Sequence, residues 1–167
     1  MSVVRALACG LLAGAVGTLA MDSLWFVRYK RGGGQSDPWT WESAAGLASW
    51  DDAAAPAKVG KLLYESVRRQ PLPASRARLA THVVHWSYGV QWGVIFSLAV
   101  GSRRHLRPWQ GPLLGSLAWL SSYVALPVAG VYQPIWRYDP KTLWQDLSAH
   151  LVYGTAVAAA FWIACAA

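Results

Sequence analysis

Four long apolar stretches with almost no charge constrain this chain more than any other feature of its sequence. They lie at about 3–26, 79–101, 110–130 and 143–166. Each is long enough to cross a hydrocarbon core of about 30 Å as an α-helix. Only 14% of the 167 residues are charged, against about 25% in ordinary globular domains, and the charges cluster between the apolar stretches. The sequence therefore predicts an all-α integral membrane protein, a four-helix bundle that forms a single domain over residues 1–167.

Residues 27–77 form the only sizeable connection between these spans. Within it, a helix is predicted from Pro56 to Arg69, because apolar residues recur on one side at helical spacing. The apolar side contains Val59, Leu62, Leu63 and Val67, and the polar side contains Lys58, Lys61, Glu65, Arg68 and Arg69. Such an amphipathic helix suits the membrane interface, where its basic side would meet anionic headgroups. Packing over the loops of the bundle is the alternative, and the sequence leaves both open.

The distribution of charge predicts an orientation and argues against nucleic acid as a partner. The net charge is +7, but no basic run is accompanied by a nucleic-acid-binding motif. Eleven of the fifteen Lys and Arg fall on the side of the 27–77 connection, and four fall on the side of the chain ends. Because cytoplasmic loops are enriched in Lys and Arg, the connection is predicted to be cytoplasmic. The predicted partners of the chain are membrane lipids.

The N-terminal stretch resembles a signal peptide only superficially. Arg5 leaves no apolar region ahead of Cys9, and the stretch continues to Phe26 without a cleavage site, so a retained transmembrane helix is expected. The two cysteines, Cys9 and Cys165, both fall within apolar stretches. They are predicted to be small packing residues, with no disulfide framework and no CxxC metal pattern.

A short motif, His-x-x-Tyr-Gly, occurs twice in the chain. It spans 85–89 in the second apolar stretch and 150–154 in the fourth. The first and third stretches also match, with Gly10, Leu12, Gly14 and Leu19 corresponding to Gly111, Leu113, Gly115 and Leu120. A two-helix unit used twice is therefore predicted, with the copies parallel and related by an axis along the membrane normal.

This topology places the polar residues of the spans in one leaflet, on the side of the 27–77 connection. The candidate ligand or proton site consists of Asp22, His82, His85, Tyr88, Tyr123, Asp146, His150 and Tyr153. Helical spacing puts His82 and His85 on one face, and Asp146, His150 and Tyr153 on one face of the last span. Acids and histidines inside a span usually face a bundle interior or water, so a buried polar pocket is expected.

Several interpretations of this pocket stay open. The side chains would fix helix packing through hydrogen bonds, or they would bind a small ligand or relay protons. A divalent metal would find ligands in His82, His85, Asp146 and His150, although no spacing enforces a closed site. A haem b held axially by His85 and His150 would make the chain a redox protein. Without a specific signal, no cofactor is the default expectation.

No nucleophile elbow, P-loop, dinucleotide-binding pattern or HExxH motif occurs, so the sequence leans against an enzyme. The aromatic loop at 131–142 carries Trp136 and Asp139, which are predicted either to cover the pocket as a lid or to anchor the loop at the interface. The strips of small residues would also suit a homo-oligomer or membership of a larger membrane complex as an accessory subunit.

Several of these segments resemble a known family. The residues concerned are Trp109, Gln110, Gly111, Leu113, Leu114, Gly115, Leu126, Pro127, Gly130, Pro134, Trp136, His150, Leu151 and Val152, with Gly10, Gly14, His82, Trp86 and the run 96–101 earlier. Together they resemble the YagU-like group of small bacterial inner-membrane proteins, and all four spans are covered. The resemblance implies a multi-pass protein of the bacterial inner membrane, of uncharacterised activity, with a suggested link to acid tolerance. His82 and His150 match the family pattern, whereas Asp22 and His85 depart from it, which weakens a metal or haem site that requires His85.

Overall fold

The computed structural model describes residues 2–42, 50–51, 53–100 and 107–165. The α-helices are α1 (Val3–Arg31), α2 (Pro38–Glu42), α3 (Ala55–Arg68), α4 (Ala77–Val100), α5 (Gln110–Val128) and α6 (Pro140–Cys165), with 3-10 turns η1 (Ala74–Arg76) and η2 (Ile135–Arg137). No strand occurs among the described residues. Helices α1, α4, α5 and α6 are long and apolar enough to cross a membrane. The prediction of an all-α chain with four helices long and apolar enough to span a membrane is confirmed.

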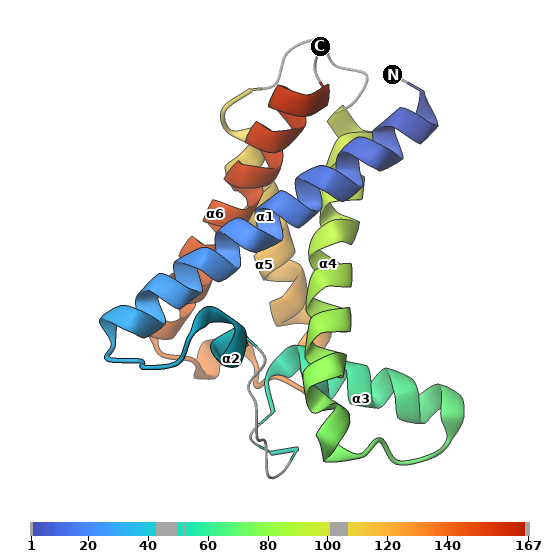
Figure 1. The fold of residues 1–167 in the computed structure, drawn as a ribbon, viewed down its shortest axis with the longest axis vertical. Coiled ribbons are helices and arrows are strands. Elements are labelled where there is room, and N and C mark those ends of the chain that lie inside the picture. Colours follow the sequence, from blue (N-terminus) through green and yellow to red (C-terminus); the bar gives the residue numbers. More distant parts are fainter. Residues whose placement is uncertain (1, 43–49, 52, 101–106, 166–167) are drawn as a thin grey trace.

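The four long helices are not arranged as a closed ring. α1 runs diagonally across the molecule and packs against both α4 and α6, while α5 packs against α6 (Figure 1). Helices α4 and α5 barely touch each other. The two chain ends lie at one end of the molecule, here called the terminal end, and α2 and α3 lie at the opposite, connection end (Figure 1). The gap in the ring, between α4 and α5, is called the seam below.

The long helices follow the predicted spans to within three residues, except at the end of α1. α1 continues to Arg31, five residues beyond the predicted end at 26. Its last turns are held against α6 because the Arg28 guanidinium donates to the Gln145 carbonyl (2.7 Å) and to Ser148 Oγ (2.8 Å). The predicted span ends at 101 and 166, and residues 43–49 and 52 of the predicted connection, fall outside the described residues.

Two short-range acidic caps set the starts of α2 and α6. The Asp37 carboxylate accepts hydrogen bonds from the backbone N–H groups of Trp39 (3.0 Å) and Thr40 (3.1 Å). Asp139 does the same for the N–H of Thr142 (2.9 Å). Bonding to the Thr40 and Thr142 side chains and N–H groups lowers the pKa of both carboxyl groups. Both helices therefore begin with an ionised N-cap, which also suits the helix dipole.

Glycines allow α1 and α4 to cross at backbone contact. A Cβ placed on Gly93 of α4 would lie 2.5 Å from the Gly10 carbonyl oxygen and from the Gly14 Cα of α1. A Cβ on Gly14 would lie 2.8 Å from the Val90 Cα. No larger residue fits at these positions, so this crossing is the close-packed type that small residues permit between membrane helices.

The crossing of α5 with α6 uses the same kind of surface, shifted by one turn. A Cβ on Gly111 would lie 2.9 Å from the Gly154 carbonyl oxygen, and Gly115 faces the backbone of His150. Gly89 and Gly154 are the equivalent last residues of the two His-x-x-Tyr-Gly motifs. Gly89 lies against Gly14, whereas Gly154 lies against Gly111, which is the counterpart of Gly10 and not of Gly14. The helix pairs therefore share a packing surface but differ in register by four residues.

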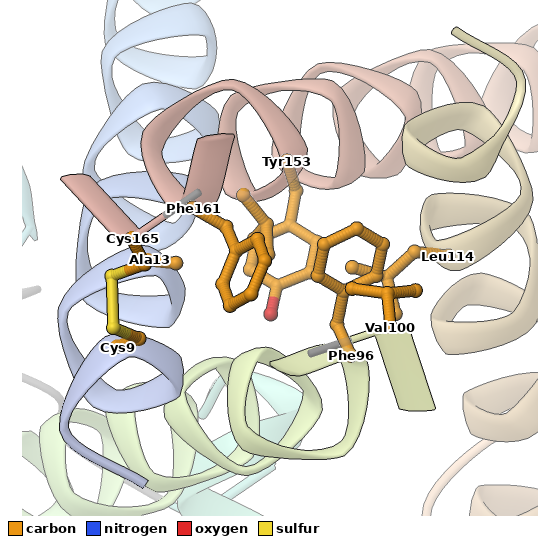
Figure 2. Packing of buried hydrophobic residues seen from close by; sticks show 9 residues of the cluster. Cys9, Ala13, Phe96, Val100, Leu114, Tyr153, Phe161 and Cys165 are labelled. Carbon is orange, nitrogen blue, oxygen red and sulfur yellow. A yellow bond between two sulfur atoms is a disulfide. The ribbon is translucent and has the colours of Figure 1, made fainter. Parts of the chain in front are cut away.

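The terminal end contains the main hydrophobic core and a disulfide. Phe96 of α4 packs edge-to-face on Phe161 of α6, with ring centroids 5.7 Å apart (Figure 2). Beside them, Cys9 and Cys165 form a disulfide between the first turns of α1 and the last turn of α6 (Figure 2). The prediction that these cysteines only pack was wrong. Because both helices begin or end at the same end of the molecule, residues 156 positions apart in sequence come together there.

At the connection end, α2 and α3 attach to different long helices. Trp41 of α2 packs against Phe26 of α1, with centroids 5.4 Å apart. α3 packs along α4, with Ala57 fully buried, while Leu63 and Val67 of its apolar side are 59% and 79% exposed. The predicted amphipathic helix thus exists, and part of its apolar surface faces away from the rest of the molecule.

Candidate functional site

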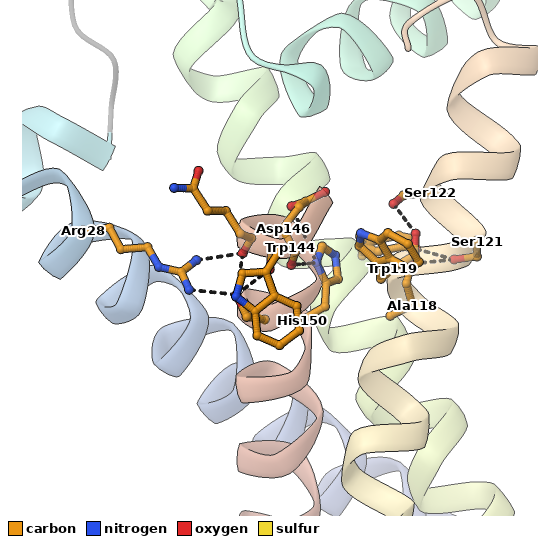
Figure 3. A network of polar contacts seen from close by, with 11 residues as sticks. Arg28, Ala118, Trp119, Ser121, Ser122, Trp144, Asp146 and His150 are labelled. Atoms are coloured by element: carbon orange, nitrogen blue, oxygen red, sulfur yellow. Dashed lines mark hydrogen bonds and ion pairs between the residues drawn. The ribbon is translucent and has the colours of Figure 1, made fainter. Parts of the chain in front are cut away.

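A cavity of about 410 Å³ opens between α4 and α5 at the connection end of the seam. It is lined by residues of the four long helices, of the start of α3 and of the loop before α6. Its polar lining consists of His85, Tyr88, Gln91, Ser121, Ser122, Tyr132, Asp146 and His150. Figure 3 shows part of this network, with Asp146 and His150 on α6 and the serines on α5. We refer to this space as the polar cavity.

The first of two acid–histidine pairs connects α1 to α4. His85 Nε2 lies 2.8 Å from Asp22 Oδ1, and both side chains are largely buried. The other carboxylate oxygen, Asp22 Oδ2, is buried and has no hydrogen-bond partner. A buried carboxylate oxygen without a donor is costly, so this pair has a remaining capacity to accept a hydrogen bond.

The second pair lies within α6, one turn apart. His150 Nδ1 bonds the backbone carbonyl of Asp146 at 2.9 Å, and it lies 3.7 Å from the Asp146 Oδ1 (Figure 3). The imidazole is therefore oriented by the helix backbone more than by the carboxylate. Asp146 and His150 both line the polar cavity, so the carboxylate adds a strong acceptor there.

Tyr88 is the side chain that connects α4 to α5 across the seam. Its hydroxyl donates to the Ala118 carbonyl (2.8 Å) and lies 2.6 Å from Ser121 Oγ. Below it, a small inner cavity of about 50 Å³ is lined by His85, His150 and Tyr153, among others. The Tyr153 hydroxyl donates to the Gly89 carbonyl, which ties α6 to α4.

Three tyrosines pack together beside the cavity, and one of them, Tyr132, lines it. Tyr123, Tyr132 and Tyr138 pack with ring centroids 5.3–6.0 Å apart. Burial, with a smaller effect of the Asp146 charge, raises the pKa of Tyr132 to about 12. Tyr132 is therefore a neutral hydrogen-bonding group at the cavity wall. Tyr132, Gln91 and Trp92 were not predicted as site residues, although Trp92 lies two turns after His85 on the same helix face.

Some predicted site residues lie elsewhere. His82 stacks on Trp39 of α2, with ring centroids 6.5 Å apart, and does not line the polar cavity. Residues three apart on an α-helix point about 60° apart, so His82 contacts α2 while His85 contacts Asp22 of α1. Trp136 and Asp139, which were predicted to cover the pocket or to anchor the loop, do not line the polar cavity: Trp136 is 80% exposed, and Asp139 serves as the N-cap of α6. The loop contributes Tyr132 to the cavity instead.

The described histidines and acids do not form a metal-ligand cluster. Among those residues, no three His, Cys, Asp or Glu are grouped closely enough to hold a metal ion. His82 belongs to the α2 contact, whereas His85 and His150 are each bound to an acidic residue of their own pair. For a haem, His85 Nε2 is already engaged by Asp22 Oδ1. The geometry favours hydrogen-bonding pairs over the predicted metal or haem ligand sets.

Comparisons with protein-family models, curated proteins and solved structures found no match to this chain. The resemblance to the YagU-like group therefore stays a prediction. What the site can do follows from its own geometry: two acid–histidine pairs, several hydroxyls and an amide surround a space that is open along the seam.

Proposed function

We propose that this protein is a non-enzymatic, multi-pass membrane protein whose polar cavity binds a small hydrogen-bonding ligand. The observation that supports this most is the convergence of Asp146, His150 and His85 on a 410 Å³ space. Ligand pockets in proteins commonly measure about 300–1,000 Å³ and carry a few convergent polar groups. Polar side chains that served only packing would be expected to fill the space between their helices.

Binding is a better account than proton transfer across the membrane. In the described part of the terminal half, the buried polar side chains are Ser97 and Gln110. Ser97 donates to the Ala6 carbonyl (2.7 Å), and Gln110 accepts from the Arg107 N–H (2.8 Å). Neither titrates, and the disulfide and aromatic core occupy the same half. The described residues of that half therefore offer a proton no chain of buried titratable groups to follow.

The charge of the cavity indicates what kind of ligand it accepts. Its strongest hydrogen-bonding group is an acceptor, the Asp146 carboxylate, whereas Asp22 does not line it. None of the residues that line it is Lys or Arg. An anion would meet a carboxylate without a compensating cation, which is unfavourable in a low-dielectric setting. A neutral or cationic hydrogen-bond donor is the complementary ligand.

A fragment-binding measurement tests this function. Ethanolamine and acetate are compared as probes by saturation-transfer NMR on the full chain in detergent. Ethanolamine should bind and acetate should not. The Ser122→Trp variant, which fills the cavity, should abolish the ethanolamine signal. Val124→Trp, two residues away on a 61% exposed position outside the cavity lining, is the matched control and should leave it unchanged. Equal ethanolamine signals in both variants would overturn the proposal.

We also propose that the connection end faces the cytoplasm of a bacterial inner membrane. Two independent observations support it. The connection end carries eleven of the fifteen Lys and Arg. The Cys9–Cys165 disulfide lies at the terminal end, and disulfides form and persist in oxidising compartments such as the periplasm. The exposed Leu63 and Val67 of α3 would then enter the cytoplasmic headgroup layer.

A labelling experiment tests this orientation. A cysteine introduced at Ser36, in the connection before α2, should react with an impermeant maleimide in inverted vesicles and not in spheroplasts. The Cys9→Ser/Cys165→Ser background removes the native thiols. Labelling in spheroplasts would reverse the orientation.

Internal duplication and membership of the YagU-like group belong to the same proposal. Gly10, Gly14, Gly111 and Gly115, which carry the predicted repeat and the resemblance, all lie at the two helix crossings. The one-turn difference in register between the crossings is compatible with two copies that diverged. The implied link to acid tolerance would then act through the acid–histidine pairs of the polar cavity.

A further inference from the structure

The polar cavity is one half of a longer groove. A second cavity of about 210 Å³ continues along the seam toward the terminal end. Trp92 and Ile95 line both cavities, so the two meet at these side chains. On α4 the lining extends from Val84 to Val100, sixteen residues, or about 24 Å along the helix at 1.5 Å per residue. That is most of the thickness of a hydrocarbon core, about 30 Å.

Polarity changes sharply along this groove. The polar groups named above all line the connection-end cavity. The second cavity is walled mainly by apolar side chains such as Phe96, Leu114 and Leu117. Its polar side chain, Gln110, is bound to the backbone of Arg107. A ligand that fills the whole groove must therefore have a hydrogen-bonding head and an apolar chain.

The surroundings of the groove determine what would enter it. α4 and α5 are both long and apolar enough to cross a membrane, and they barely contact each other. Ile95 and Leu117, which line the second cavity, are 43% and 46% exposed, so that cavity opens sideways between the helices. In a bilayer, this opening faces lipid acyl chains. The occupant is therefore expected to arrive from the membrane and not from the aqueous phase.

We propose that the seam binds a single-chain membrane amphiphile with an uncharged, hydroxyl-bearing head. The head lies in the polar cavity near Asp146, and the chain runs past Ile95 into the second cavity. This inference rests on the proposed function, because it assigns the class of ligand that the polar cavity takes. The acceptor-rich lining without Lys or Arg selects a donating head over a phosphate. The smaller apolar half, about 210 Å³, suits one chain.

Native mass spectrometry of the full chain in detergent tests the proposal. Equal amounts of monoolein and oleoyl lysophosphatidic acid are offered together, since these amphiphiles share the glycerol and the chain and differ in the phosphate. Monoolein adducts should exceed those of the anionic lipid at least tenfold. Equal binding, or preference for the phosphate, would overturn the head assignment.

A matched pair of variants tests the position of the chain. Ile95→Trp places a bulky ring where the two cavities meet and should weaken monoolein binding at least tenfold. Leu98→Trp, three residues further on α4, is 51% exposed and lines neither cavity, so it should leave binding unchanged. If Ile95→Trp fails to fold, Leu117→Trp on the opposite wall replaces it and should weaken monoolein binding to the same extent.

Ethanolamine binding distinguishes the two levels of the proposal. If Ile95→Trp loses monoolein and keeps ethanolamine, the chain occupies the second cavity as proposed. If both groove variants keep full monoolein binding while Ser122→Trp loses it, the polar cavity stands and the chain assignment is overturned. If Ser122→Trp changes neither monoolein nor ethanolamine binding, the proposed function itself fails.

Discussion

The α1–α4 crossing and the α4–α5 seam lie on the same helix, α4, and are built in opposite ways. At the crossing, Gly93 of α4 and Gly14 of α1 bring backbone against backbone, with no space for one additional carbon. At the seam, His85, Tyr88 and Trp92 project from α4, and the hydroxyl of Tyr88 makes the hydrogen bonds to α5. One face of the helix is closed by small residues, and the other is held open by large ones.

This difference shows how the fold positions a site without a closed bundle. The glycine crossings and the disulfide fix α1, α4 and α6 relative to one another, and the α5–α6 crossing fixes α5. With both sides of the seam anchored elsewhere, α4 and α5 do not need to contact each other. The open seam is therefore compatible with a stable fold, and the following predictions test that division.

The largest effect is expected at the α1–α4 crossing. Gly93→Val would drive a side chain into the backbone of Gly10 and Gly14, at a cost of about 3 kcal/mol or more. The measurement is thermal unfolding in detergent. Ala99→Val, on the same helix but in the second cavity, is the control and should change stability by less than about 0.5 kcal/mol. Equal losses would show that the seam is packed as tightly as the crossing.

Removal of the disulfide should have the next largest effect. The Cys9→Ser/Cys165→Ser variant is expected to lose about 2–4 kcal/mol of unfolding free energy, because the link closes a long loop in the unfolded chain. Monoolein binding should be retained, since the disulfide belongs to the closed side of the molecule. Reduction of the unmodified chain should reproduce the loss. A variant of full stability that loses binding would contradict the separation of the two regions.

A smaller effect is expected from Tyr88→Phe. It removes the hydroxyl bonded to the Ala118 carbonyl and Ser121, at a cost of about 1 kcal/mol. Spin labels on α4 and α5 should report a wider or more variable seam, while labels on α1 and α4 should be unaffected. Tyr64→Phe on α3 is the control. An unchanged distribution across the seam would mean that another contact holds α5 in place.

The smallest effect concerns titration at the cavity wall. The pKa of Tyr132 is raised to about 12 in the folded chain, above the ordinary value near 10. The folded state therefore keeps its proton more tightly than the unfolded state. The resulting stabilisation is complete below pH 10 and is lost as pH rises through 12. Absorbance at alkaline pH should show a tyrosine titration near pH 12 that is lost in Tyr132→Phe. A Tyr132 signal near pH 10 would indicate a solvated hydroxyl outside the cavity wall.

Much of the architecture could be predicted because a membrane span is recognisable from the length and the apolar composition of its stretch of sequence. The four long helices followed from apolar stretches, and the glycines of the predicted repeat lie at the crossings, although Gly93 was not among them. The disulfide was missed because cysteine in an apolar stretch carries no local sign of its partner. Pairing depended on Cys9 and Cys165 reaching the same end of the molecule, on the facing sides of α1 and α6.

The site was predicted less completely, for a different reason. Helical spacing located Asp146 and His150 correctly on one face, because both lie on one straight helix. It could not separate His82 from His85, since the choice depends on α2, which presents Trp39 to His82. Nor could it predict the seam, because an opening between α4 and α5 arises from how α1 and α6 hold them apart.

The most direct test is a high-resolution map of the protein in a lipid nanodisc supplied with monoolein. An occupied seam is the expected result, with continuous density from the Asp146 carboxylate, past Ile95, to Leu114. Helices α4 and α5 closed on each other, with Ile95 packed against Leu117 and no elongated density between them, would contradict the account.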